Sequence, residues 1–168
     1  MATEILTLDV LLDRLPRFAR LLGLDLGTKT IGVAVSDVER HIASPVETIR
    51  REKFTADVLQ LAKIAKAQEA FALVIGLPLN MDGTEGPRAQ ATRSFVRNLA
   101  AHMSLPVIFQ DERLSTAAVT RTLIEQDASR AKRAEVVDRM AAAYILQGAL
   151  DRMQRLQRDK AEADSKLP

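Results

Sequence analysis

The sequence contains no cysteine, and aromatic residues make up only 4% of its 168 residues. Without cysteine the chain has no disulfides, thiolate metal sites or cysteine nucleophile, which fits a reducing cytoplasm. Few aromatic rings argue against a single-strand binder that stacks bases on aromatic side chains. No apolar run approaches the ~20 residues of a membrane-spanning helix, and the first residues lack the basic start and cleavage site of a signal peptide. We therefore expect a cytoplasmic protein without a membrane partner.

Charge is nearly balanced over the whole chain, with 24 lysines and arginines against 22 acidic residues and a net charge of +2. This balance does not by itself indicate a polyanionic partner. The C-terminal part is more basic, because residues 113–158 hold nine basic and five acidic side chains. A basic face suits a phosphate backbone, although charge alone favours an ordinary solvated helix surface.

Length and composition indicate a globular protein of one domain, since 168 residues with 47% apolar and 27% charged residues can bury a core without disulfides. Short apolar segments predict strands at residues 21–27, 30–37, 41–49, 71–79 and 106–112. Helical spacing and proline positions predict helices within the first twenty residues and at 54–70, 87–101, 115–126 and 135–158. This order predicts an α/β fold whose central sheet is covered by helices on both faces.

One acidic residue lies in an otherwise apolar strand. Period-two alternation places Leu22, Leu24 and Leu26 on one face of this strand and Asp25 on the other. Burying a lone carboxylate costs several kcal/mol unless a partner neutralises it. The alternative is a turn aspartate that caps the bend after Gly27. From this segment alone the two interpretations are equally supported.

Two further acidic residues lie at the ends of predicted elements. Glu112 follows the fifth strand at its carboxyl end, where open α/β sheets gather their ligands. The alternative for Glu112 is a solvated loop before a helix capped by Ser115 or Thr116. Asp138 heads the apolar helical stripe of Ala141, Ala142, Ile145 and Ala149. The helix dipole favours an acid in the first turn, but it does not explain a position on the core-facing stripe.

Together these positions allow Asp25, Glu112 and Asp138 to converge at one edge of the sheet. Clustered carboxylates repel one another and raise each other's pKa. A hard divalent cation removes this conflict, and oxygen-only ligands suit Mg²⁺ or Mn²⁺. Two such ions can clamp the attacking and leaving oxygens of a phosphoryl transfer. The pattern therefore predicts hydrolysis of a phosphodiester by a metal-activated water.

Candidate substrate-binding residues lie in the neighbouring turns. Gly27, Thr28 and Lys29 begin a tight turn whose amides and one positive charge can face a phosphate. Asn80 belongs to the glycine-containing loop after the fourth strand, which is either a lid or a plain connector. Arg113 can hold a phosphate or pair with Asp111. The chain lacks the Walker A and dinucleotide-binding glycine patterns and the nucleophile elbow of serine hydrolases.

Four segments of the chain resemble, in order and spacing, the signature blocks of the YqgF family. The segments are GLDLGTKTIGVAVSD, VIGLPLNMDGTEGP, DERLST and VDRMAAAYILQ. The family is also called RuvX or the Holliday junction resolvase family, and the likeness covers roughly residues 20–150. The resemblance implies a ribonuclease H-like fold with a five-stranded mixed central sheet flanked by helices on both faces. It further implies a Mg²⁺- or Mn²⁺-dependent nuclease that trims the 5′ end of the pre-16S rRNA in ribosomal precursor particles.

Carried over by position, the family's catalytic and metal-binding acids are Asp25, Glu112 and Asp138. The domain division expected from this likeness is a helical extension at 1–19, a nuclease domain at 20–158 and a polar tail at 159–168. The stretch SRAKRAEVV before Asp138 departs from the lysine-glycine-lysine type common in the family. This departure leaves the local approach of nucleic acid open.

Three other functions remain as alternatives. A DNA junction resolvase would use the same acids but needs paired sites, and therefore a dimer; we expect a monomer or a weak dimer. A non-catalytic RNA-binding scaffold would keep the fold, although all three acids are retained. The segment GLDLGTKTIGVAV also resembles the first phosphate loop of actin-like ATPases, but these need a second loop and about twice this length.

Overall fold

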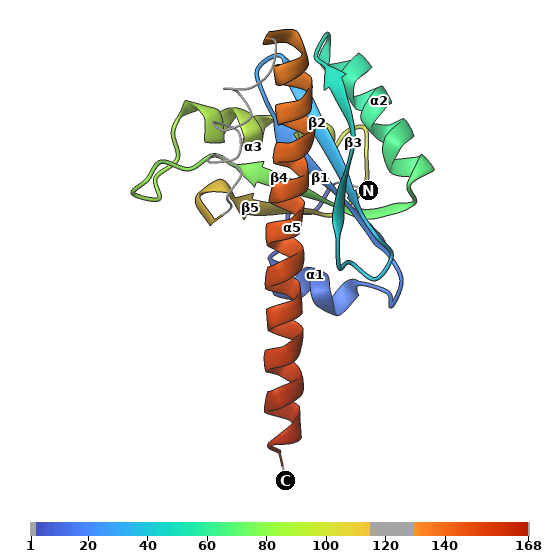
Figure 1. The fold of residues 1–168 in the computed structure, drawn as a ribbon, viewed down its shortest axis with the longest axis vertical. Coiled ribbons are helices and arrows are strands. Elements are labelled where there is room, and N and C mark those ends of the chain that lie inside the picture. The colour runs from blue at the N-terminus through green and yellow to red at the C-terminus, as the bar shows by residue number, and fades with distance from the viewer. Residues whose placement is uncertain (1–2, 115–129, 168) are drawn as a thin grey trace.

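The computed structural model describes residues 3–114 and 130–167 of the chain, and its centre is a five-stranded sheet (Figure 1). The strands are β1 (Arg20–Leu26), β2 (Thr30–Ser36), β3 (Ala43–Arg50), β4 (Ala70–Leu77) and β5 (Val107–Asp111). Their order across the sheet is β3-β2-β1-β4-β5. β2 is antiparallel to β1 and β3, whereas β4 is parallel to β1 and β5. The predicted five-stranded mixed sheet is therefore confirmed.

Helices cover both faces of this sheet. They are α1 (Leu8–Arg14), α2 (Phe54–Ala67), α3 (Pro87–Leu99) and α5 (Arg130–Ser165), with a short 3-10 turn, η1, at Glu112–Leu114. α2 and α3 pack on one face, and α5 crosses the other and contacts all five strands. Pro87 stands in the first turn of α3, where its missing N–H is not needed. The predicted helix at 115–126, with its caps at Ser115 and Thr116, lies outside the described residues.

The two edges of the sheet are finished differently. β3 forms one edge, and Pro45 lies at an irregularity of its pairing with β2, as expected for a proline in an edge strand. At the other edge the N-terminal segment pairs with the start of β5. There Leu6 N–H donates to Val107 O at 2.8 Å, and Val107 N–H donates to Glu4 O at the same distance. The N-terminal segment therefore extends the sheet at its β5 edge.

α5 is longer than the sequence pattern predicted. It was expected at 135–158 but begins at Arg130 and continues to Ser165, because its last turns contain lysine, glutamate and alanine, which favour helix, and no glycine or proline. Figure 1 shows α5 projecting beyond the sheet toward the C-terminus. Lys160 on this projecting part pairs with Asp13 of α1 at 2.9 Å. No helix within residues 3–114 and 130–167 has the length and apolar character needed to cross a membrane.

The two faces of the sheet bury different side chains. The expected alternation in β1 is confirmed, because Leu22 and Leu24 belong to the cluster under α2 and α3, and Leu21 to the cluster under α5. The first cluster is built from large aliphatic and aromatic side chains. The second includes the predicted small stripe of α5, with Ala142, Ile145 and Ala149 fully buried. The α5 face is thus where the helix backbone comes closest to the sheet.

Candidate active site

Asp25 lies in the middle of the sheet, on the face covered by α5. It is 2% exposed, and its partner in the antiparallel ladder is Gly32 of β2. Gly23, two residues earlier on the same face, approaches Leu146 of α5 so closely that a Cβ would lie 2.7 Å from the Leu146 Cβ. Asp25 is therefore a buried strand residue rather than a cap of the following turn.

Asp138 of α5 lies over β2, against the ladder partner of Asp25. A Cβ added at Gly32 would collide with the backbone carbonyl of Asp138, so only glycine at this position admits the helix. Cross-strand partners point to the same face of a sheet. The backbone of Asp138 therefore lies beside Asp25 on one side. Thr30 Oγ1 donates a hydrogen bond to Asp138 Oδ2 and ties this acid to the start of β2.

Glu112 approaches from the opposite side, over β4. A Cβ at Gly76 would lie 2.7 Å from Glu112 Oε1 and 2.6 Å from Ile145 Cδ1. The β1–β4 register pairs Leu24 with Ile75, so the next residues along, Asp25 and Gly76, are neighbours on adjacent strands. The carboxylate of Glu112 thus lies in the space that Gly76 leaves open. The three predicted acids come from β1, η1 and α5 and lie on the α5 face, where two glycines make room for Asp138 and Glu112.

The donor set of these acids consists of carboxylate oxygens, which are the ligands that Mg²⁺ and Mn²⁺ prefer. Asp25, Glu112 and Asp138 do not, however, form a group whose oxygens all lie within 4.8 Å of one another. Within the described residues that spacing is met by Asp37, Glu39 and His41. The acids around Asp25 are therefore spread more widely than the ligands of a single compact ion site.

The group of Asp37, Glu39 and His41 is exposed and lies in the turn between β2 and β3. Asp37 Oδ1 accepts hydrogen bonds from the backbone N–H of His41 at 2.7 Å and of Ile42 at 2.8 Å. Partial burial raises the pKa of Asp37, but hydrogen bonds from backbone N–H groups of the turn, those of Ile42 and His41 foremost, together outweigh it and hold the pKa below its usual range. Arg40 in this turn has a positive φ of 59°. These contacts make Asp37 the carboxylate that closes the hairpin, and the sequence patterns did not single this group out.

The predicted turn after β1 is tied down at both ends. Gly27 N–H donates to Thr30 O at 2.9 Å. Arg51, which follows β3, donates from Nη1 to Gly27 O at 2.6 Å and from its backbone N–H to Lys29 O at 2.8 Å. Thr28 and Lys29 are exposed at the tip of this turn. Both side chains are thus presented to solvent at the carboxyl end of β1, three and four residues after Asp25.

The loop that contains Asn80 is closed by its own hydrogen bonds. Asn80 N–H donates to Thr84 O at 2.9 Å, and Gly83 N–H donates to Asn80 O at 2.8 Å. Gly83 has a φ of 89°, in the left-handed region that favours glycine. The Thr84 hydroxyl and backbone N–H lower the pKa of Asp82, with a smaller contribution from Arg113. The loop is a hydrogen-bonded unit that projects beyond the sheet in Figure 1.

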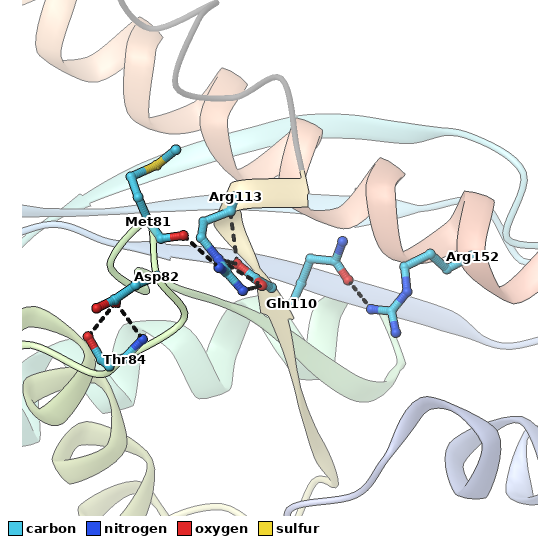
Figure 2. A network of polar contacts seen from close by, with 7 residues as sticks. Met81, Asp82, Thr84, Gln110, Arg113 and Arg152 are labelled. Atoms are coloured by element: carbon cyan, nitrogen blue, oxygen red, sulfur yellow. Dashed lines mark hydrogen bonds and ion pairs between the residues drawn. The ribbon is translucent and has the colours of Figure 1, made fainter.

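Arg113 pairs with Asp111, one of the two alternatives that the sequence left open. Its Nη2 lies 2.7 Å from Asp111 Oδ2, and its Nη1 donates to Met81 O at 3.1 Å. The hydrogen bonds from Arg113 hold the pKa of Asp111 below its usual range. Figure 2 shows Arg113 between the projecting loop and the end of β5, beside Glu112 in the chain. Arg113 therefore links the loop to Asp111 at the end of β5, the residue before Glu112.

Comparison with known proteins identifies the family. A sequence model of the RuvX family, described as Holliday junction resolvase, matches residues 19–152. The chain belongs to the RuvX family. A protein of Methylocella silvestris named "Putative pre-16S rRNA nuclease" is 63% identical, over 95% of this chain and 99% of its own. A Rhizobium meliloti protein of the same name is 54% identical, over 98% of this chain and 99% of its own.

A solved structure of this general shape is T. thermophilus RuvC in complex with a Holliday junction substrate. It covers 81% of this chain and 96% of its own, with 15% identity and a TM-score of 0.49.

The four segments that resemble the family's signature blocks all lie within residues 19–152, which the RuvX family model matches. The family assignment predicted from these segments is thereby confirmed.

Sequence reasoning missed several residues that shape the site of this RuvX protein. Gly32 and Gly76 make room for Asp138 and Glu112; glycines inside neighbouring strands are a signal of close backbone approach. Gln110 is 1% exposed and accepts a hydrogen bond from Arg152 Nη1 of α5 at 2.8 Å, as Figure 2 shows. This contact joins α5 to β5 just before Glu112. Nothing in the local sequence pairs two residues 42 positions apart.

Proposed function

We propose that this protein is a divalent-metal-dependent nuclease that hydrolyses phosphodiester bonds in 5′-end processing of pre-16S rRNA. The proposal is supported by the position of Asp25, Glu112 and Asp138 on one face of the sheet, with Asp138 against Gly32 and Glu112 against Gly76. Buried or clustered carboxylates are costly unless a cation neutralises them. Family membership and the names of close relatives support the nuclease assignment and supply the candidate substrate.

Asp25, Glu112 and Asp138 would hold the metal, Mg²⁺ or Mn²⁺. When bound, such an ion supplies an activated water and stabilises charge that develops on the phosphate oxygens. Thr30, by its hydrogen bond, orients Asp138 toward the sheet. Arg152 fixes Gln110 and so steadies the end of β5 before Glu112.

The substrate-binding residues in this proposal are Gly27, Thr28, Lys29, Asn80 and Arg113. Lys29 and Thr28 are exposed at the turn beyond Asp25, where amides and one positive charge can face a phosphate. Arg113 retains its charge while paired with Asp111, and Asn80 lies in the loop that Arg113 contacts. These positions follow the carboxyl ends of β1, β4 and β5, where ligands of α/β sheets bind.

The setting we propose is the bacterial cytoplasm, with ribosomal precursor particles as partners and a monomer or weak dimer as the working form. The proposed domain division is an extension at 1–19, a nuclease domain at 20–158 and a tail at 159–168. α1 packs Leu8 and Leu11 into the cluster under α5. The extension and the nuclease domain therefore share one core.

Cleavage of a labelled RNA that spans the 5′ end of the pre-16S rRNA tests the proposal. Wild type is expected to cut with Mg²⁺ or Mn²⁺ and not with chelator, and Glu112→Gln to lose cutting in every condition. Glu47→Gln is the matched control, because Glu47 is an exposed carboxylate on the edge strand β3. Cutting that chelator leaves unchanged rejects the metal mechanism. Wild-type rRNA maturation in cells that carry Asp25→Asn supports a non-catalytic scaffold instead.

A DNA junction resolvase is the second candidate, because the family model carries that description. Symmetric cutting of a four-way junction needs two sites related by a two-fold axis. Sedimentation of the protein with and without a synthetic junction tests this candidate. A stable monomer that cuts the RNA but not the junction excludes it.

A further inference from the structure

A small pocket lies at the carboxyl end of β1, on the face of the sheet that α2 and α3 cover. Its volume is about 90 Å³, and its lining includes Gly27 and Thr28 of the turn, Arg51 after β3, and Arg88 and Phe95 of α3. A volume of this size equals the share of about three liquid water molecules. The pocket therefore offers room for one small oxyanion.

The charge of this pocket is uniformly positive. Arg51 and Arg88 line it, and none of its lining residues carries a carboxylate. Arg51 is held in place, since its Nη1 donates to Gly27 O at 2.6 Å and its guanidinium lies 5.7 Å from the centre of the Phe95 ring. Within residues 3–114 and 130–167 the guanidinium of Arg88 makes neither a hydrogen bond nor an ion pair. One fixed and one uncommitted cation thus face the same small space.

Two guanidinium groups around one cavity repel each other, and an anion between them removes that repulsion. The planar fork of arginine matches the geometry of phosphate oxygens and supports two parallel hydrogen bonds. Thr28 also lines the pocket. These groups together select a phosphate-like oxyanion over a neutral or cationic ligand.

The pocket shares the β1–β2 turn with the acidic site. Gly27 forms its wall, while Thr30 at the other end of the turn holds Asp138 on the opposite face of the sheet. A nucleic-acid strand that passes over the end of β1 can therefore contact both. We propose that the Arg51–Arg88 pocket binds a phosphate group of the substrate strand beside the phosphodiester that the acids cleave. This inference rests on the proposed nuclease function and adds a binding subsite to it.

Binding of a fluorescein-labelled single-stranded RNA, measured by anisotropy in chelator across a range of KCl concentrations, tests the subsite without cleavage. Arg88→Gln is expected to weaken binding by about fivefold or more and to reduce the slope of log K against log salt by about 0.7, the value for one lost phosphate contact on a single strand. Arg97→Gln is the matched control, because Arg97 lies on the same helix, contacts Ser94 at 2.9 Å and does not line the pocket. Its binding is expected to stay within about twofold of wild type.

Equal RNA binding by wild type and Arg88→Gln overturns the subsite. An equal loss of RNA binding in Arg97→Gln also overturns it, because such a loss shows that net charge alone controls binding. Titration of inorganic phosphate onto protein labelled with ¹⁵N-arginine separates a free anion from a strand phosphate. Shifts of the Arg51 and Arg88 Nε–H signals that Arg88→Gln removes support binding of phosphate itself in the pocket. A titration that leaves both signals unmoved overturns phosphate binding in the pocket.

The subsite and the nuclease proposal fail separately. If Asp25→Asn abolishes cutting while Arg88→Gln changes neither binding nor cutting, the nuclease stands and the subsite is wrong. If no RNA is cut under any metal condition but Arg88→Gln weakens RNA binding as expected, the subsite stands and the nuclease is wrong.

Discussion

The two faces of the sheet are built from the same five strands but differ in the size and polarity of their side chains. The face under α2 and α3 buries Leu22, Leu24, Val33 and Ile75. The face under α5 includes Gly23, Gly32 and Gly76 among its inward positions, together with the carboxylate of Asp25. Large aliphatic side chains stabilise the first face by removing apolar area from water. On the second face glycine buries almost no apolar area and contributes little of this stabilisation. It instead leaves room for a helix backbone and for two further acids on the face that carries Asp25.

The face under α2 and α3 therefore stabilises the fold, whereas the face under α5 carries the candidate catalytic acids. Among the described residues two aspartates are buried to the same extent, Asp57 on α2 and Asp25 on β1, both 2% exposed. Asp57 Oδ1 accepts a hydrogen bond from Glu52 N–H at 2.9 Å and closes the start of α2. Asp25 lies on the face where Asp138 packs against its ladder partner Gly32 and Glu112 packs against Gly76 of the neighbouring strand. The two aspartates are alike in burial and differ in what surrounds them, which makes them a matched pair for experiment.

The largest effect is expected from Asp25→Asn. Replacing the carboxylate by an amide of the same shape removes the central negative charge, and we expect RNA cutting to fall at least about a thousandfold, about 4 kcal/mol in the barrier. Cleavage rates at saturating Mn²⁺ measure this loss, and circular dichroism checks that the fold is kept. Cutting within tenfold of wild type would remove Asp25 from the chemistry.

The next effect concerns stability of the apolar face. Leu24 is fully buried, and Leu24→Ala is expected to lower the free energy of unfolding by about 2–5 kcal/mol through lost burial and a cavity. Urea unfolding followed by circular dichroism measures the change. Leu59→Ala is the control, because Leu59 on α2 is 66% exposed. A change at Leu24 no larger than at Leu59 would show that this face is not the stabilising one.

Gly32→Ala tests the close approach on the α5 face. Its Cβ would collide with the carbonyl of Asp138, a backbone atom that no rotamer change can move. We expect a loss of about 1–3 kcal/mol of stability from overpacking, together with reduced RNA cutting because Asp138 is displaced. Gly86→Ala is the control, since its Cβ would meet the Asn80 side chain at 3.3 Å. Normal cutting by Gly32→Ala would mean that Asp138 need not lie beside Asp25.

Asp57→Ala sharpens the comparison of the two buried aspartates. Loss of its hydrogen bond to Glu52 N–H should cost about 1 kcal/mol of stability, while the rate of RNA cutting stays at the wild-type value. Thermal unfolding and the cleavage assay on the same preparation give both quantities. A cutting defect as large as that of Asp25→Asn would contradict the assignment of chemistry to the α5 face.

The smallest effect is expected at the Asp111–Arg113 pair. Hydrogen bonds from Arg113 lower the pKa of Asp111 in the folded protein. A lowered pKa means that this stabilisation is complete above the unfolded value of about 3.9 and is lost as the pH falls through the folded value. Asp111→Asn should therefore lower Tm slightly at pH 7 and have less effect near pH 3. A Tm difference that does not change between these pH values would exclude the ion pair as its cause.

Much of the fold could be predicted because apolar residues recur along the chain at the spacing of strands and helices. The alternation in β1, the small stripe of α5 and the proline of the edge strand β3 all follow from spacing and backbone chemistry. α5 ends at Ser165 and not at the predicted residue 158, because the charged residues at 159–165 lack an apolar stripe but have high helix propensity. The pairing of Arg113 with Asp111 was only one of two options, since a guanidinium accepts any nearby anion.

By itself, the sequence determined the strand and helix order, the three acidic positions and the family. Only the tertiary structure decided that Gly32 faces Asp138, that Gly76 faces Glu112, and that Arg51 and Arg88 line one pocket. The physical reason is that these contacts depend on strand register and on where α5 and α3 lie across the sheet. Such placement results from the packing of the whole core, and no short stretch of chain encodes it.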